Sequence, residues 1–153
     1  MRGTTPKTEP DTVETFMRMC HDAGLKVTHQ RLEIFRELVR ADDHPSAEDL
    51  HARVRKRMPV VSLDTVYRTL AAFERCGVAR KLPVAGAARF DGRPDDHQHV
   101  VCRRCKKITD LHWPAAARLR PPAALGKWGR IEGRYLHFVG LCNDCLREER
   151  RRR

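Results

Sequence analysis

The chain has 153 residues and a formal net charge of +11, a length that allows one ordinary domain or two small ones. The basic excess favours a polyanionic partner but is uneven, because residues 78–153 carry 18 basic against 8 acidic side chains and residues 1–77 carry 13 against 12. No apolar run approaches the length of a membrane span and the N-terminus lacks the apolar core of a signal peptide. We therefore expect a cytoplasmic protein with no membrane partner.

Helical spacing of apolar residues dominates the first half of the chain. It predicts helices over about 12–23, from Thr28 to about residue 41, from Ser46 to the residue before Pro59, and over 62–76. Two short apolar segments, 78–82 and 88–90, then predict a β-hairpin. Three helices, a fourth helix with a polar face and a hairpin are typical of a winged helix-turn-helix, although a generic helical bundle remains an alternative.

The fourth predicted helix has the features of a DNA-recognition helix. Its apolar residues repeat at helical spacing, and Thr65 and Arg68 lie on the opposite, polar side. Such a helix enters the major groove, where Thr and Arg side chains meet base edges or phosphates. The alternative is an ordinary solvated helix face.

The second half predicts a small α+β unit. Residues 91–97 combine Gly92, Pro94 and three aspartates, which is typical of a hinge. Strands are predicted at 100–101, 108–111 and 131–139, and a short helix over 115–119 is ended by Pro121. The predicted fold is therefore α+β, with a winged-helix domain at 1–90, a hinge at 91–97 and a zinc-stapled α/β dimerisation domain at 98–153.

Two Cys-x-x-Cys pairs predict a closed metal site. Each pair makes a tight knuckle whose two sulfurs point at one ion, and four thiolates are the ligand set of structural Zn²⁺. A reactive dithiol is the alternative, but no redox fold is evident. The predicted ligands are Cys102, Cys105, Cys142 and Cys145.

A second group of ligands surrounds the first knuckle. His97 and His99 are one residue apart, so a strand would direct both imidazoles to one face. Asp91 and Asp110 stand on either side, and imidazole with carboxylate suits Fe²⁺, Mn²⁺ or Zn²⁺. A solvated pair of histidines and an ordinary strand-end aspartate are the alternatives.

Six segments in order resemble the Fur family of bacterial metal-dependent repressors over nearly the whole chain. The resemblance implies a homodimer that binds a double-stranded DNA operator, with metal at the hinge locking two winged helices onto the DNA. The segments are Gly24–Arg31, His44–Leu50, Ser62–Leu70, Arg89–Asp91, Asp96–Cys105 and Gly140–Cys145.

The resemblance also assigns roles to individual residues. It implies a regulatory Fe²⁺ or Mn²⁺ bound by His44, Asp91, His97, His99 and Asp110, and DNA contacts from Lys26, Tyr67 and Arg68 beside Thr65. Residues alone give no reason to bring His44 into the site. Tyr67 has an alternative role as half-buried core.

The two hinge aspartates are most like the peroxide-sensing (PerR-type) branch, since iron-uptake regulators more often carry glutamate at the position of Asp110. In that branch, Fe²⁺ and peroxide oxidise a histidine ligand, here His44 or His97, and DNA is released. This happens once per molecule, so the protein is not expected to be an enzyme.

Two departures from the family and two alternative functions remain. Gln98 and Arg134 replace ligands of a further metal site, which we expect to be absent, and prolines interrupt the segment 114–129. An iron or zinc uptake regulator on the same scaffold is the first alternative. A zinc-dependent hydrolase using His97 and His99 is the more distant one, and it lacks an obvious general base.

Overall fold

The structure is a computed structural model that describes residues 9–82, 84, 86–93, 95–131 and 134–152. The chain divides into two compact units, residues 1–94 and 95–153. The boundary falls within the segment 91–97 that the sequence analysis predicted to be a hinge. No helix among the described residues is both long and apolar enough to cross a membrane.

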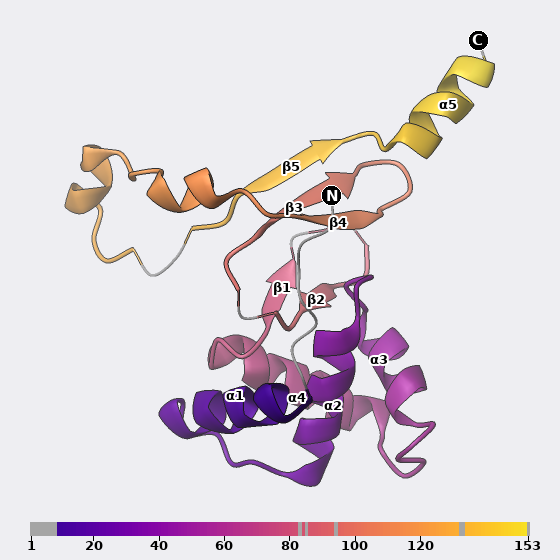
Figure 1. Cartoon of the computed structure of the whole chain (residues 1–153), viewed down its shortest axis with the longest axis vertical. Coiled ribbons are helices and arrows are strands. Elements are labelled where there is room, and N and C mark those ends of the chain that lie inside the picture. Colours follow the sequence, from indigo (N-terminus) through magenta and orange to yellow (C-terminus); the bar gives the residue numbers. More distant parts are fainter. Residues whose placement is uncertain (1–8, 83, 85, 94, 132–133, 153) are drawn as a thin grey trace. The chain divides into compact units, whose positions relative to one another are not determined.

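Unit 1 is a helical bundle followed by a hairpin (Figure 1). Its elements are α1 (Glu9–Asp22), α2 (His29–Arg40), α3 (Ala47–Val54), α4 (Leu63–Arg75), β1 (Arg80–Leu82) and β2 (Arg89–Asp91). Strands β1 and β2 pair antiparallel, and they contact α4 and α2 respectively. The predicted order of helices and wing is confirmed. Two bounds differ, because α1 begins three residues earlier than the predicted residue 12 and α3 ends at Val54, four residues before the predicted end next to Pro59.

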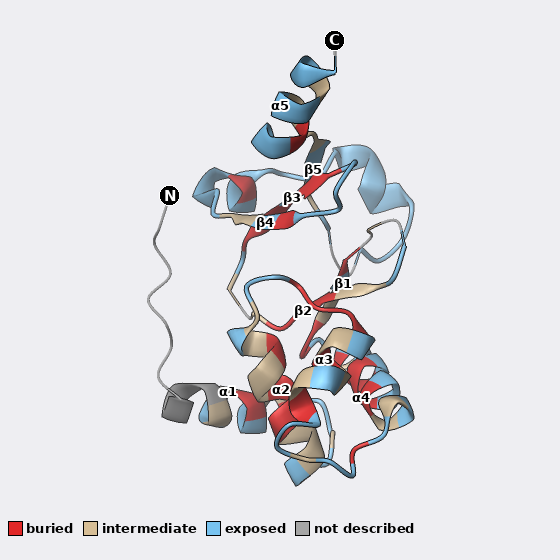
Figure 2. Ribbon diagram, turned by 90° about the vertical axis from the view of Figure 1, so that its right-hand side faces the viewer, coloured by how far each residue is buried: buried red, intermediate tan, exposed pale blue. Residues whose placement is uncertain are grey.

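Three phenylalanines hold this bundle together. Phe16, Phe35 and Phe73 come from α1, α2 and α4, and their ring centroids lie 4.6 to 6.2 Å apart. All three are buried, and Figure 2 shows the buried positions as red bands along the faces of α2, α3 and α4. Offset and edge-to-face ring pairs add to the stability that the burial of their area provides.

Side-chain caps fix where the helices of unit 1 begin. The hydroxyl groups of Thr28, Ser46 and Ser62 accept hydrogen bonds from backbone N–H groups three residues later, at the starts of α2, α3 and α4. At α3, Asp49 also accepts from the backbone N–H of Ser46, which completes a capping box. At the other end of α4, Gly77 adopts a φ of 69°, a conformation that glycine tolerates without strain.

Unit 2 is built on a three-stranded sheet in the order β4-β3-β5. Strand β3 (Gln98–Cys102) pairs antiparallel with β4 (Ile108–Leu111) and parallel with β5 (His137–Gly140). Helix α5 (Asn143–Arg151) follows and is mostly exposed, with Cys145 buried near its start (Figure 2). The predicted start of the last strand at residue 131 is wrong, because β5 begins at His137, where its pairing with β3 starts at His99.

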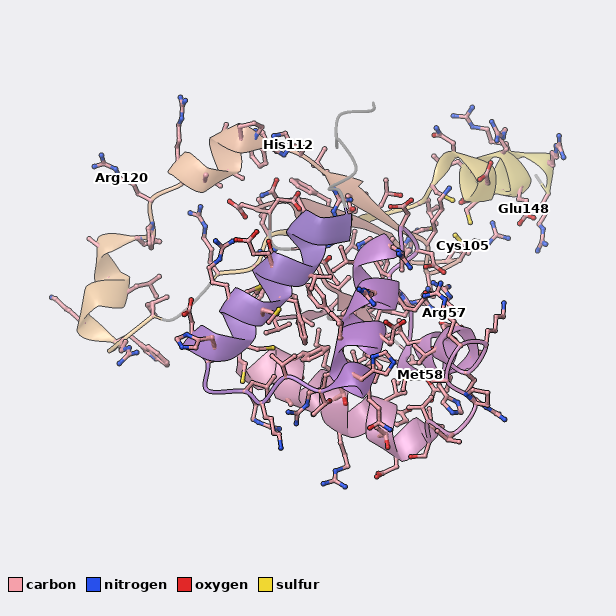
Figure 3. All side chains as sticks on the ribbon, turned by 60° about the horizontal axis from the view of Figure 1, so that its bottom comes forward. Arg57, Met58, Cys105, His112, Arg120 and Glu148 are labelled. Atoms are coloured by element: carbon pink, nitrogen blue, oxygen red, sulfur yellow. The ribbon has the colours of Figure 1, made fainter. Side chains whose placement is uncertain are left out.

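The proline-interrupted segment of unit 2 forms short 3₁₀ helices, Pro114–Arg118 and Ala123–Lys127. The first overlaps the helix predicted over 115–119, but it is a 3₁₀ helix that begins at Pro114 and ends at Arg118, before Pro121-Pro122. The guanidinium of Arg134 donates hydrogen bonds to the carbonyl groups of Ala116 and Leu119 and so ties the segment to the approach to β5. Arg120 extends away from this segment into solvent (Figure 3).

Candidate metal centres and nucleic-acid interface

The four predicted zinc ligands converge in unit 2. Their sulfur atoms all lie within 4.8 Å of one another, although the two knuckles are far apart in sequence. The Sγ–Sγ distances are 3.8 Å between Cys102 and Cys145 and 3.7 Å between Cys105 and Cys142. Four sulfurs placed tetrahedrally, each about 2.3 Å from Zn²⁺, would be about 3.8 Å apart. The spacing of the thiols therefore fits a structural zinc ion.

Strand β3 and helix α5 position these sulfurs. Cys102 ends β3, Cys142 immediately precedes α5, and its backbone N–H donates to Cys102 Sγ at 3.4 Å. Figure 3 shows Cys105 near the start of the helix that carries Glu148. Backbone N–H groups of Cys142 and Cys105 lower the pKa of the Cys102 thiol to about 6, whereas burial raises the pKa of Cys145 to about 12. The backbone therefore favours a thiolate at Cys102, the form that binds metal.

A second cluster lies at the other end of β3. The Nε2 atoms of His97 and His99 are 3.1 Å apart, and each is 3.6 Å from Asp110 Oδ1. Both histidines are buried. Asp110 sits on β4 directly opposite His99, so the strand pairing brings carboxylate and imidazole together. Two nitrogens that bind one ion at about 2.1 Å would be about 3.0 Å apart in adjacent octahedral positions and about 3.4 Å apart in a tetrahedron, so the spacing of 3.1 Å fits a shared ion.

The orientation of His97 is fixed by a further hydrogen bond. Its Nδ1 lies 2.9 Å from the carbonyl oxygen of Asp95, so Nδ1–H donates and Nε2 is directed toward His99 and Asp110. This is the arrangement that a ligating histidine usually has, because the second ring nitrogen sets the tautomer. His97, His99 and Asp110 thus form an imidazole–carboxylate set within unit 2 that can bind a divalent cation.

The remaining predicted ligands, His44 and Asp91, belong to unit 1. Both are buried, at 2% and 3% exposure. Asp91 ends β2, and its Oδ1 accepts a hydrogen bond from the backbone N–H of Arg93 at 2.9 Å. His44 lies in the loop between α2 and α3 with a positive φ of 50°. Their membership of one regulatory site with the unit 2 ligands stays a prediction.

The positions that depart from the family have structural roles in unit 2. Gln98 is buried, and its side-chain oxygen accepts a hydrogen bond from the backbone N–H of Trp113. Arg134 binds the carbonyl groups described above. His137 stacks on His99, with ring centroids 5.7 Å apart, and burial lowers its pKa.

A basic hollow of about 590 Å³ lies on unit 1 between the start of α2 and the polar face of α4. Three predicted DNA-binding residues, Lys26, Thr65 and Arg68, line it. Arg31 and Arg75 line it too, although neither was among the predicted DNA contacts. The helical spacing of Arg68 and Arg75, seven residues apart on one face, is the signal that could have identified the second of them.

Tyr67 lies on α4 but not in this hollow. It is 45% exposed, and it is not among the residues that form or pack against the hydrophobic core cluster. Its hydroxyl donates a hydrogen bond to the carboxylate of Glu48 at the start of α3. This bond raises the pKa of Tyr67 and lowers that of Glu48.

A winged helix joined to a sheet unit with a four-thiolate site and a separate histidine–aspartate cluster defines a class of metal-binding, winged-helix proteins. Within this class, the chain belongs to the Ferric uptake regulator family, whose model matches residues 22–125. Members of the family are transcriptional regulators and not enzymes, which removes the support for a hydrolase.

Individual relatives agree with this assignment. The chain is 32% identical to the Peroxide operon regulator of Bacillus subtilis over 129 residues, which are 84% of this chain and 89% of that protein. A zinc-bound manganese uptake regulator has a similar structure, with a TM-score of 0.60, 27% identity and coverage of 86% of this chain and 98% of that one. The ferric uptake regulator of Helicobacter pylori shares the fold, with a TM-score of 0.71 at 22% identity over 94% of this chain and 97% of that one.

Proposed function

We propose that this protein is a cytoplasmic, metal-dependent transcriptional repressor that senses peroxide through oxidation of a histidine in its regulatory site. The observation that carries the proposal is the convergence of His97, His99 and Asp110 in unit 2. The similarity to a regulator named for a peroxide operon supports it further.

The two metal sites have different roles, one structural and one regulatory. Cys102, Cys105, Cys142 and Cys145 hold a structural Zn²⁺ that joins the sheet to α5. His97, His99 and Asp110, together with His44 and Asp91 from unit 1, hold a regulatory Fe²⁺ or Mn²⁺. Such a set takes ligands from both units, so the bound cation favours the arrangement in which they meet. That arrangement is the one that binds DNA.

When bound, Fe²⁺ would supply the electron that breaks the O–O bond of hydrogen peroxide, which Mn²⁺ does not readily do. In the net reaction, one hydrogen peroxide would convert a ring C–H bond of His44 or His97 into a C–O bond, the ring would lose two electrons, and the second peroxide oxygen would leave as water. An oxidised ring is a poorer ligand, so the site loses a bond between the units and the DNA-binding arrangement is no longer favoured. The response is irreversible within one molecule, and no turnover is involved.

The DNA interface is the basic hollow together with the exposed part of α4. Thr65, Tyr67 and Arg68 meet the major groove, and Lys26 contacts the phosphate backbone, with double-stranded operator DNA as the partner. Arg31 and Arg75 extend the same electrostatic surface, since both line the hollow.

A homodimer is formed through unit 2. Its edge strand β5 carries Phe138 and Val139, which are 39% and 69% exposed, and Trp113 lies beside Phe138 with ring centroids 6.1 Å apart. Exposed apolar side chains on an edge strand and beside it are typical of a surface that another subunit covers.

A metal-uptake regulator is the second candidate, favoured by the likeness to a manganese uptake regulator. The discriminating experiment starts with an operator selected from random duplexes by the Mn²⁺-loaded protein. Binding is then measured for anaerobic Fe²⁺ and Mn²⁺ forms before and after a low dose of peroxide. Loss of binding only in the Fe²⁺ form supports peroxide sensing, and unchanged binding in both forms supports the uptake regulator.

A further inference from the structure

The loop that carries His44 has an uncommon backbone. His44 has a φ of 50° and is 2% exposed, so a buried residue with a β-carbon adopts the left-handed conformation. Residues other than glycine seldom do so, and they remain there only when the surrounding structure requires it. The contacts around the loop show what imposes this conformation.

Strand β2 binds successive carbonyl groups of that loop. Arg89 Nε donates to the carbonyl oxygen of His44 at 2.6 Å, and Arg89 Nη2 donates to that of Asp43 at 3.2 Å. The backbone N–H of Phe90 donates to the carbonyl oxygen of Pro45 at 3.0 Å. The carbonyl groups on both sides of the His44 side chain are therefore held by neighbouring residues of one strand.

Two further contacts anchor the ends of the loop to α3. Arg53 donates through both terminal nitrogens to the carboxylate of Asp43, at 3.0 and 2.5 Å. On the other side, Ser46 and Asp49 form the capping box of α3, and Asp49 also lies 3.9 Å from Arg89 Nη1. Arg89 thus joins β2 to the loop and to the helix that follows it.

The same strand ends at the other predicted ligand of unit 1. Asp91 lies two residues after Arg89 on β2, and Gly92 fits closely against Leu38 of α2. Arg89 and Asp91 lie on one short strand. The hydrogen bonds that hold Arg89 against the His44 loop therefore also restrict the distance between His44 and Asp91.

We propose that Arg89 is a positioning residue for the regulatory metal site: its guanidinium fork holds the strained His44 loop against β2, so that the imidazole of His44 and the carboxylate of Asp91 are presented as one rigid pair. This inference rests on the proposed role of both residues as ligands. Arg89 binds no metal itself. Groups that orient a ligand in this way commonly change metal affinity by about 10–100-fold when removed.

The test is Mn²⁺ binding by the zinc-loaded, full-length protein, followed by the electron paramagnetic resonance of free Mn²⁺. R89A is expected to bind about tenfold more weakly. R89K is expected to fall between R89A and the wild type, because one ammonium group replaces a planar fork that binds two carbonyl groups. The visible spectrum of the Co²⁺ form should change in R89A, since the ligand geometry changes. The zinc content and the helical circular dichroism should not change.

K81A is the matched control. Lys81 is exposed on β1 directly opposite Phe90, so its removal takes the same charge from the same hairpin without touching the loop. It should bind Mn²⁺ like the wild type. If R89A proves to be unfolded, R89K is used in its place. Its ammonium group cannot donate to both carbonyl groups of the loop, so weaker Mn²⁺ binding is expected from that loss alone.

A double-mutant cycle with H44A decides whether Arg89 acts through His44. The inference predicts that R89A causes no further loss of Mn²⁺ affinity once His44 is replaced. Wild-type affinity in R89A, or a loss that adds in full to that of H44A, overturns it while leaving the proposed function intact. Wild-type affinity in H44A itself removes His44 from the site, which overturns both the inference and that part of the proposed function.

Discussion

Replacing Gly92 by alanine should destabilise unit 1 by steric overlap alone. A β-carbon at this position would lie 2.7 Å from Leu38 Cγ, 3.0 Å from Leu38 Cδ2 and 3.3 Å from Val39 Cγ2. Carbon atoms in contact normally lie about 3.5–4.0 Å apart. Leu38 is only 1% exposed and packs in the core cluster, so it has little space to move away. Overpacking of this kind costs about 1–3 kcal/mol, so we expect G92A to lower the free energy of unfolding of unit 1 by about that amount.

Urea unfolding with two signals isolates the effect. Both tryptophans, Trp113 and Trp128, lie in unit 2, whereas most of the α-helix lies in unit 1. G92A should therefore lower the midpoint seen by far-ultraviolet circular dichroism and leave the fluorescence transition in place. G126A is the control, because its β-carbon would meet nothing within 4 Å. A loss below about 0.5 kcal/mol in G92A, the range of ordinary surface changes, would refute the packing argument.

Three further predictions concern the zinc site, the link between α3 and α4, and the DNA interface. C142S should abolish zinc retention and loosen unit 2, measured by zinc content and tryptophan fluorescence, since three thiolates do not close a tetrahedral site; full zinc occupancy would contradict this. E48Q should lower the raised pKa of Tyr67, measured by tyrosinate absorbance with the other tyrosine replaced by phenylalanine. The hydrogen bond between Glu48 and Tyr67 is present between their ordinary pKa values of 4.5 and 10.0. It is lost as the pH falls through the lowered pKa of Glu48 or rises through the raised pKa of Tyr67, and an unchanged titration would argue against the bond. R75A should lower the slope of the logarithm of the DNA-binding constant against the logarithm of salt concentration by about one, because one phosphate contact is lost. R120A, which alters unit 2, should leave this slope unchanged.

Much of the fold of unit 1 could be predicted because its signals are local. Thr28, Ser46 and Ser62 mark the helix starts by their own side chains, and the apolar spacing of α2 and α4 follows the buried face. The boundary of β5 could not be predicted, because the residue pattern of 131–139 says nothing of where a partner strand pairs with it. The start of β5 at His137 coincides with its first pair with β3, at His99.

The candidate sites also differ in how far the sequence alone predicts their residues. The cysteine knuckles and the His97–His99 pair are visible in sequence because each ligand lies near its neighbour along the chain. His44 is different, since its place depends on Arg89, which is 45 residues away in sequence. Only the resemblance to the family suggested a role for it. Arg31 and Arg75 became part of the basic surface only when α2 and α4 were packed together.

The central claim is that a histidine of the regulatory site is oxidised by peroxide when iron is bound. The most direct measurement is peptide mass spectrometry of the Fe²⁺-loaded and Mn²⁺-loaded protein after one equivalent of peroxide under otherwise anaerobic conditions. The account predicts one added oxygen on the peptide containing His44 or His97, only in the Fe²⁺ form and in proportion to the loss of DNA binding. Unmodified histidines in the Fe²⁺ form, with DNA binding retained, would contradict it.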